Sequence, residues 1–408
     1  MLPEREQQDC MKLGSHSSPI HLTYCLNVHP GETWPENVEA MQTHTLAVRD
    51  AVCPDAPFGL GLRLGARAAR ELADPSNEDA FKAFLQEHNL YVYTINGFPY
   101  GRFHGGRVKE RVYQPDWTTD ARRDYTLDLA ERLAALLPDG QDGSISTLPG
   151  AYKLLVREDR DPEIMAQKMM DCVARLAELH RETGRELHLG LEPEPACFLE
   201  MTDEVIAFYN QVLLDHGRAY LSRISGEGAD TAEEWIRRHL GVCLDTCHAA
   251  LQFEDPASCL ERYAREGVRV SKVQLSAALE TANTESARRA LRPFDEPVYL
   301  HQTRARCVDG RLLRWNDLSD ALTALPRQPM AETVRIHFHV PLCWAGAPPL
   351  GTTAAGLDAR FWNALQQGAC PHLEIETYTF DVLPETLKSG PVNDSIAREF
   401  QWTLEKLT

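Results

Sequence analysis

The sequence predicts an α/β protein whose parallel strands, each followed by a helix, close into an eight-stranded (β/α)₈ barrel. Two observations lead to this expectation. Short apolar runs alternate with segments of helical period along the whole chain of 408 residues, which is typical of a parallel sheet covered by helices. In addition, no GxGxxG or GxxxxGK[ST] motif occurs, which counts against a dinucleotide- or nucleoside-triphosphate-binding domain.

Nine stretches are expected to form strands, because each is a short apolar or alternating run. They are 21–28, 58–64, 91–97, 144–150, 187–195, 240–248, 268–276, 334–340 and 372–380. A barrel of this class needs eight strands. One of the nine, within 290–345, is therefore expected to be an insertion or to lie outside the barrel wall.

Helices are expected between the strands, and the clearest is 162–183, which starts after Asp161 and carries apolar residues at helical spacing. The others are 66–88, 120–137, 202–214, 256–265, 316–325 and 356–367. The segment 217–232 is interpreted as a surface excursion without a role in the barrel.

The domain organisation expected is a polar leader at residues 1–19 and a single barrel domain at 20–408, with an insertion at about 280–345. Two long segments, 97–119 and 291–315, follow the carboxyl ends of strands. That end of a barrel is the face on which active sites are built. Loop insertions at the C-terminal face are therefore expected to form part of the site.

The charge balance excludes some classes of partner. With 60 acidic and 42 basic residues the formal net charge is −18, which repels nucleic-acid backbones and anionic lipid at long range. A nucleic-acid partner is therefore not expected.

Cysteine usage and the N-terminal sequence bear on the compartment. The 11 cysteines form no CxxC pair and no compact framework, which favours a reducing compartment. The first thirty residues lack the apolar run of a signal peptide, and no stretch is long and apolar enough to cross a membrane. A cytoplasmic location is expected.

Four expected strands carry an oxygen-bearing side chain where the apolar run stops. These residues are Glu192, Asp245, Gln274 and Glu376. Because the carboxyl ends of barrel strands meet at one mouth, the four groups would converge there. Carboxylates brought together repel unless a cation lies among them. An all-oxygen set favours Mn²⁺ or Mg²⁺, with Zn²⁺ and Co²⁺ as alternatives; a helix cap, an ion pair or a backbone contact would equally explain any one residue alone.

Three histidines near these strand ends are further candidates. His248 follows Asp245 by three residues and is assigned substrate contact or proton transfer. His337 and His339 share one face of their expected strand, so they either line the site or lie beneath it. His339 is kept as a rival to Gln274 for the metal.

Three other polar residues, Asn96, Lys272 and Glu194, lie near the same strand ends. Asn96 and the aromatic segment that follows it are expected to form one wall of the pocket and to contact the substrate. Lys272 lies on the face of Gln274, one step deeper, where a buried lysine needs a carboxylate partner. Glu194, two residues after Glu192, is interpreted as a supporting or structural group.

These motifs, LGLEPEP, CLDTCH, SKVQLS and IETYTF, together resemble the metal-binding pattern of the xylose isomerase-like TIM barrels, which include sugar phosphate isomerases and epimerases. The resemblance implies that Glu192, Asp245, Gln274 and Glu376 bind a divalent ion that orients vicinal oxygens of a polyol or keto sugar, while the two glutamates exchange a proton at carbon. The chain departs from the pattern in having Gln where many sugar epimerases have His, and in the long segment 280–345.

The N-terminal half is more specifically similar to the EboE type of metabolite-traffic protein. The stretches that carry this similarity are HLTYCLNVHPGETW, FGLGLRLG, TINGFPYGRFHGG, VYQPDW and STLPGAYK, with SKVQLSAAL and IHFHVPL further on. The similarity implies a part in making or exporting a small, cyclitol-type metabolite, contact with membrane proteins of the same gene cluster, and a homodimer as in related barrels.

The function expected is therefore a metal-dependent isomerase or epimerase acting on a polyhydroxy carbonyl compound. Glu192 and Glu376 would accept and donate the proton on opposite faces of the substrate, and His248 would hold a hydroxyl group. The alternative is a non-catalytic metabolite-binding or export-complex protein on the same fold. Endonuclease IV-like phosphodiester cleavage would need several histidine ligands and a basic groove, and both the charge and the oxygen-rich set weigh against it.

Overall fold

The computed structural model describes residues 12–13, 19–385, 388 and 390–407. Eight parallel strands form a nearly closed barrel with the order β2-β14-β8-β7-β6-β5-β4-β3, and an isolated parallel bridge between Cys25 and Gly61 joins the two ends. The barrel strands are β2 (Ile20–Tyr24), β3 (Phe58–Arg63), β4 (Leu90–Asn96), β5 (Gly143–Thr147), β6 (Leu187–Leu191), β7 (Leu240–Asp245), β8 (Val270–Leu275) and β14 (His372–Ile375). The predicted barrel is confirmed.

Each barrel strand lies within or close to a predicted stretch, but several end earlier than predicted. The stretch 187–195 ends as a strand at Leu191, because two prolines follow and cannot donate to a sheet. The stretch 240–248 ends at Asp245, because the Asp245 side chain caps the next helix by accepting from the His248 backbone N–H at 3.0 Å.

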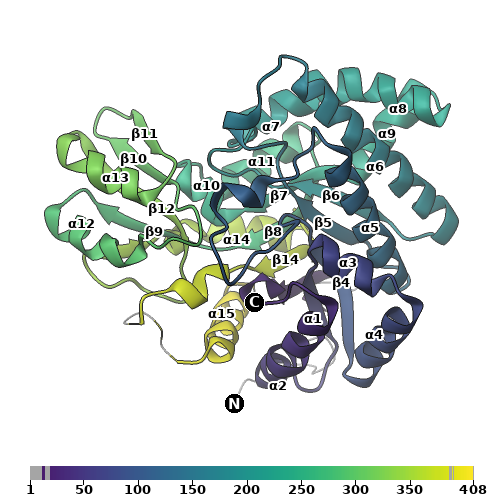
Figure 1. Cartoon of the computed structure of the whole chain (residues 1–408), viewed down its shortest axis with the longest axis horizontal. Helices are drawn as coiled ribbons and strands as arrows, with labels where there is room; N and C mark the ends of the chain where they lie inside the picture. The colour runs from purple at the N-terminus through teal and green to yellow at the C-terminus, as the bar shows by residue number, and fades with distance from the viewer. Residues whose placement is uncertain (1–11, 14–18, 386–387, 389, 408) are drawn as a thin grey trace.

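Helices cover the outside of the barrel wall (Figure 1). In the barrel they are α1 (Trp34–Ala40), α2 (Leu46–Val52), α3 (Ala66–Leu72), α4 (Pro75–Glu87), α5 (Asp120–Leu136), α6 (Asp161–Thr183), α7 (Thr202–Phe208), α8 (Arg218–Ser225), α9 (Ala229–His239), α10 (Thr246–Leu251), α11 (Pro256–Arg265), α14 (Ala359–Gln366) and α15 (Val392–Leu407).

Two predictions for the segments between the strands need correction. The predicted helix 66–88 is two helices, because Pro75 starts α4 after the Asp74 cap. The segment 217–232 is not an excursion: it contains α8 and the start of α9, separated by a short break at Gly226, whose φ of 76° ends α8.

The chain between β8 and β14 builds a second, antiparallel sheet with the order β11-β10-β12-β9-β13. It consists of β9 (Ala278–Ala282), β10 (Thr303–Cys307), β11 (Leu312–Trp315), β12 (Ala331–His339) and β13 (Leu350–Thr352), with α12 (Glu285–Leu291) and α13 (Leu318–Ala324). This sheet lies at one side of the barrel (Figure 1). The predicted strand 334–340 falls in β12, so the ninth strand lies outside the barrel wall, as expected.

The remaining segments are short. Lys12–Leu13 form β1, which pairs antiparallel with β2, while residues 1–11 and 14–18 of the predicted leader lie outside the described residues. Among the residues that the structure describes, no helix has the length and apolar character needed to span a membrane.

Candidate metal centre at the barrel mouth

Three of the predicted carboxylates meet at the carboxyl end of the barrel. One oxygen each of Glu192, Asp245 and Glu376 lies within 4.8 Å of the other two. All three side chains are buried, with residue exposures of 4%, 1% and 4%. They come from the ends of β6, β7 and β14, so the sequence prediction of convergence at one mouth describes their arrangement.

The backbone of the barrel fixes where two of these carboxylates start. The Glu192 backbone N–H donates to Thr147 O at 3.0 Å, and that of Glu376 donates to Leu275 O at 3.0 Å. Both bonds continue the hydrogen bonding of the parallel sheet by one residue beyond the strand. The two side chains therefore begin at the rim of the wall.

Polar neighbours then orient Asp245 and Glu376. Asp245 Oδ1 accepts from the Ser276 hydroxyl at 2.7 Å, in addition to capping α10. Glu376 Oε1 accepts from the side-chain amides of Asn27 at 2.7 Å and Asn96 at 3.1 Å. In each carboxylate one oxygen is held by protein groups, so Asn96 belongs to the site through Glu376.

The charge state of the centre reflects burial and crowding. Burial, together with the neighbouring carboxylates, raises the pKa of Glu192 and of Glu376 well above the ordinary value. Burial would also raise the pKa of Asp245, but His248, His339, the neighbouring Glu376 carboxyl group and the Ser276 hydroxyl outweigh it and the pKa is lowered. Without a cation, the centre therefore favours one ionised carboxylate flanked by two protonated ones.

Two residues, Gln274 and His339, are candidates for the metal ligand that would accompany the three carboxylates. Gln274 Oε1 accepts from the Cys243 thiol at 3.0 Å, so the atom that could bind a metal already has a partner. His339 comes from β12 of the second sheet, and its Nδ1 lies 2.7 Å from Glu376 O. A carbonyl only accepts, so Nδ1 carries the proton and Nε2 presents its lone pair. That Nε2 lies 4.0 Å from Asp245 Oδ2.

The donor set fits a cation. Glu192 Oε2, Asp245 Oδ2 and His339 Nε2 are fully buried, and none of them has a hydrogen-bond partner among the described residues. Buried polar atoms are almost always paired, and each unpaired one requires an explanation. Asp245 belongs to two candidate ligand groups, one with Glu192 and Glu376 and one with His248 and His339, so a cation beside Asp245 could be bound from either side. The Nδ1 contact of His339 is the outer partner that metal-bound histidines have.

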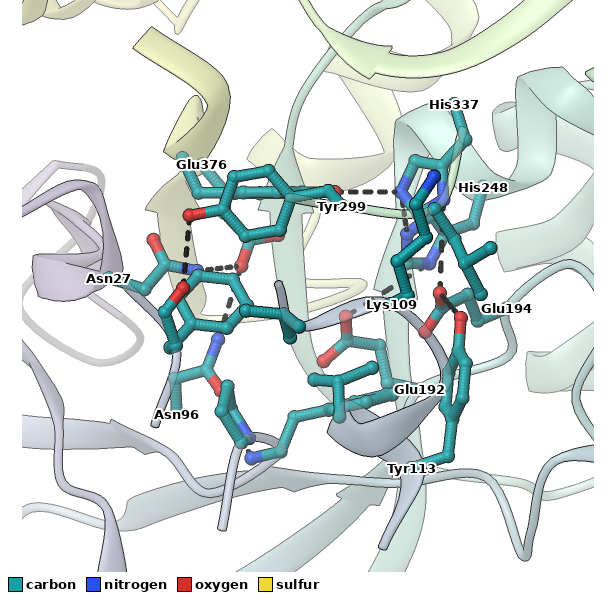
Figure 2. A pocket seen from close by; sticks show the side chains of 17 residues that line it. Asn27, Asn96, Lys109, Tyr113, Glu192, Glu194, His248, Tyr299, His337 and Glu376 are labelled. Atoms are coloured by element: carbon teal, nitrogen blue, oxygen red, sulfur yellow. Dashed lines mark hydrogen bonds and ion pairs between the residues drawn. The ribbon is translucent and has the colours of Figure 1, made fainter. Parts of the chain in front are cut away.

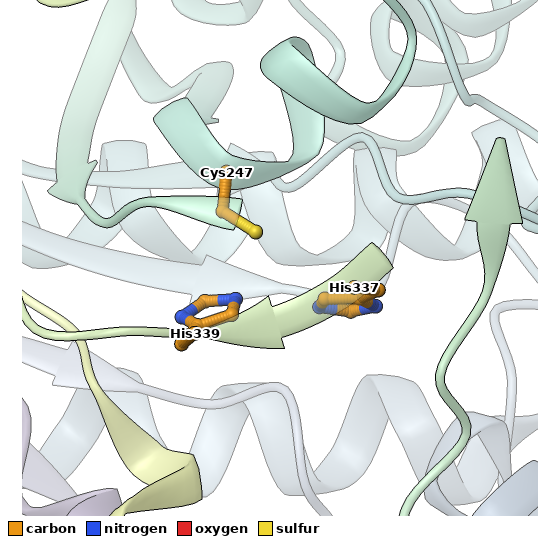
Figure 3. Close-up of side chains that lie close together, drawn as sticks. All are labelled: Cys247, His337 and His339. Carbon is orange, nitrogen blue, oxygen red and sulfur yellow. The ribbon is translucent and has the colours of Figure 1, made fainter. Parts of the chain in front are cut away.

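His248 and His337 form a second group beside the carboxylates. His248 Nε2 lies 3.0 Å from His337 Nε2. In the same region the Cys247 side chain, at the start of α10, projects toward His337 and His339 on β12 (Figure 3). The prediction that His337 and His339 share a face of one strand describes their positions.

A pocket of about 520 Å³, including open space at its mouth, gives access to these groups. Asn27, Asn96 and Glu376 line one side, and His248 and His337 line the other (Figure 2). Apolar and aromatic side chains form its outer part, among them Phe98, Phe103, Val108, Tyr299 and Tyr378. The loop after β4 and the chain before β10 supply most of these, so the long segments noted in the sequence do contribute walls.

Several residues of the site were not predicted. Asn27 could have been found, because it is a polar residue just past the first strand. Tyr113 and Gln302 have no sequence signal: the Tyr113 hydroxyl donates to Glu194 Oε1 at 2.6 Å and accepts from Gln302 Nε2 at 2.7 Å. Burial raises the pKa of Glu194 to about 8, partly offset by the hydrogen bonds that its Oε1 accepts from Tyr113 and, at 3.3 Å, from Gln302 Nε2.

The fold and the site together define an α/β barrel with a buried acidic and histidine centre at its C-terminal mouth. No protein-family model and no curated protein sequence matches the chain. Solved structures do match the fold at low sequence identity.

The chain is similar to a xylose isomerase domain protein from Alicyclobacillus acidocaldarius, with 13% identity and a TM-score of 0.45 over 95% of this chain and 98% of that one. It is similar to the probable 3-DHS dehydratase AsbF from Bacillus anthracis, with 8% identity and a TM-score of 0.44 over 94% and 98%. The IolI protein with a bound zinc atom matches with 10% identity and a TM-score of 0.42 over 95% and 97%.

Proposed function

We propose that the protein is a divalent-metal-dependent isomerase or epimerase that acts on a polyhydroxy carbonyl metabolite of the sugar or cyclitol type. The observation that carries the proposal is the unpaired, buried oxygen of Asp245 at the mouth of the barrel, which lies close to Glu192 and Glu376 on one side and to the unpaired Nε2 of His339 on the other. A centre of this kind, at the end of a pocket with aromatic walls, suits a small polar substrate.

The proposed ligands are Glu192, Asp245, Glu376 and His339. This set replaces Gln274 by His339, because the Gln274 oxygen already accepts from Cys243. Three oxygens and one imidazole nitrogen suit Mn²⁺, Co²⁺ or Zn²⁺ better than Mg²⁺. When bound, the ion would polarise a substrate oxygen and stabilise negative charge that develops on it.

Glu192 and Glu376 are the proposed proton acceptor and donor. Two amides hold Glu376 Oε1, which leaves its other oxygen for the substrate or the ion. Both groups have a raised pKa when no ion is bound. A cation bound beside them would favour the ionised form that accepts a proton, and a carboxyl group that has taken a proton can donate it again. The two side chains start from β14 and β6, on different parts of the rim, so they can address different faces of a bound molecule.

His248 is proposed to position a substrate hydroxyl group. Its Nδ1 lies 3.0 Å from Pro193 O, which fixes the proton on Nδ1 and leaves Nε2, which lies 3.0 Å from His337 Nε2, as an acceptor. A hydroxyl of the substrate could donate to this nitrogen. Asn96 would act indirectly, by holding Glu376.

The test is exchange of a substrate carbon-bound hydrogen with solvent. Metal-loaded protein incubated in D₂O with a panel of ketoses and inososes should introduce deuterium at the carbon next to the carbonyl, detected by NMR or mass spectrometry. Glu376→Gln should abolish the exchange. The matched control is Glu254→Gln, because Glu254 is a largely buried glutamate outside this pocket that accepts from the Thr202 backbone N–H. Turnover without label would contradict the proton-exchange mechanism.

We also propose the EboE-type assignment and the associated role in making or exporting a metabolite, on the sequence motifs given above. In that context the barrel would be cytoplasmic and could work with membrane proteins of its gene cluster. If purified protein binds those partners equally well before and after metal removal, and no substrate exchanges deuterium, the non-catalytic reading of the fold is favoured over the isomerase.

A further inference from the structure

His248 and His337 approach each other through the same nitrogen. Their Nε2 atoms are 3.0 Å apart, and both residues are buried, with exposures of 4% and 3%. A hydrogen bond between two imidazoles needs a proton on one of the facing nitrogens. The other contacts of the two rings decide whether such a proton is present.

Both rings carry their proton on Nδ1. His248 Nδ1 contacts the carbonyl of Pro193 at 3.0 Å, and His337 Nδ1 contacts Gln302 Oε1 at 2.6 Å. The orientation of the Gln302 amide is fixed, because its Nε2 faces Glu194 Oε1 at 3.3 Å and Pro195 O at 3.0 Å, which only accept. The two Nε2 atoms of the neutral rings therefore face each other with lone pairs, and a cation between them would bind both. The Tyr378 hydroxyl lies 3.5 Å from His337 Nε2.

The surrounding groups favour a metal ion over a single proton. Three buried carboxyl groups adjoin the pair, and no lysine or arginine of the described residues forms an ion pair with any of them. They are Glu192, Glu194 and Asp245. A shared proton would use only the two ring nitrogens, whereas a metal ion could bind both nitrogens and a neighbouring carboxylate oxygen.

Carboxylate oxygens are in place to complete such a site. Asp245 Oδ2, which has no hydrogen-bond partner among the described residues, lies 3.9 Å from His248 Nε2 and 4.0 Å from His339 Nε2. It can therefore bridge two ions.

We propose that His248 Nε2 and His337 Nε2 bind a second divalent transition-metal ion, with Asp245 as the bridge to the first. Two imidazoles with carboxylates favour Zn²⁺, Co²⁺ or Mn²⁺ over Mg²⁺ or Ca²⁺. The Nδ1 contacts to Pro193 and Gln302 are the outer partners that fix the metal-binding tautomer. This inference adds an ion to the proposed active site, and His248 would then hold the substrate through it.

The experiment counts metal ions per chain. The full chain is stripped, loaded with Co²⁺ or Zn²⁺ alone, passed over a desalting column and analysed by elemental mass spectrometry. Two ions per chain are expected for the wild type and one for His337→Gln. His239→Gln is the matched control and should keep two, because His239 is also buried and its Nδ1 also contacts a backbone carbonyl, that of Leu187 at 2.7 Å.

A second measurement needs no variant. Wild-type protein loaded with Mn²⁺ should give the electron paramagnetic resonance signal of two spin-coupled ions. One ion per chain with an uncoupled signal, or two ions that His337→Gln leaves unchanged, would overturn the proposal and assign a shared proton to the pair. Failure of the proposed function is separate, because it would appear as absent deuterium exchange whatever the number of ions.

Discussion

Lys272 on β8 and Glu374 on β14 form an ion pair inside the barrel, with 2.8 Å between Nζ and Oε2 and both side chains fully buried. The pair lies two residues before Gln274 and Glu376 on the same two strands, so it forms the layer beneath the proposed centre. The buried lysine that the sequence analysis noted thus has the carboxylate partner it needs.

The first prediction concerns this pair. Lys272→Met should lower the free energy of unfolding by roughly 3–5 kcal/mol, because it leaves the Glu374 carboxylate buried without a counter-charge. Urea unfolding measures the change. The double variant Lys272→Met, Glu374→Leu should regain much of the loss, since it removes both charges. Equal stability of the single variant and the wild type would show that the pair contributes nothing.

The second prediction concerns Gly61, which leaves room for this carboxylate. A Cβ at Gly61 would lie 2.2 Å from Glu374 Oε1 and 2.7 Å from Tyr24 O. Gly61→Ala should therefore destabilise the fold by about 1–3 kcal/mol through overpacking. Gly351→Ala is the matched control, because its nearest atom would be Glu280 O at 3.6 Å, an ordinary contact. Thermal unfolding of both variants measures the difference.

The third prediction distinguishes Gln274 from His339 as the metal ligand that accompanies the three carboxylates. His339→Ala should weaken metal binding by more than the roughly 10- to 100-fold that loss of an outer partner costs. Gln274→Leu should change it less, because Gln274 Oε1 is occupied by Cys243. Titration with Mn²⁺, followed by calorimetry, gives both affinities. The reverse order would restore Gln274 as the ligand.

The fourth prediction concerns pH and a glutamate on α15. Burial raises the pKa of Glu399 from 4.5 to about 7, although the Leu342 N–H and the Thr377 hydroxyl oppose this by donating to its carboxylate at 2.9 and 2.8 Å. The folded state thus holds the proton more tightly than the unfolded chain. The stability this contributes is present below pH 4.5 and is lost as the pH rises to about 7.

Glu399→Gln removes this titration. Between pH 4.5 and 7 the wild type should lose up to about 3 kcal/mol of unfolding free energy that the variant keeps. Urea unfolding at several pH values, compared between the two proteins, measures the difference. Parallel pH profiles would show that the pKa of Glu399 is the same in the folded and unfolded states.

The sequence alone predicted the barrel and the convergence of Glu192, Asp245 and Glu376 at its mouth. Both follow from local rules: apolar periodicity marks a strand, and the ends of parallel strands meet at one edge. Asn96 was found by the same reasoning. The ends of the strands were less well predicted, because prolines and helix caps decide them.

Only the tertiary structure decided the histidine side of the centre. The strand that carries His337 and His339 has the same pattern as a barrel strand, but it pairs with β9 and β10 in the second sheet. Which sheet a strand joins depends on long-range packing. The spacing of apolar residues within the strand does not report that packing. The same holds for Gln302, whose Nε2 contacts Tyr113, 189 positions away in the chain. Its Oε1 contacts His337 Nδ1 and so sets the tautomer of that histidine.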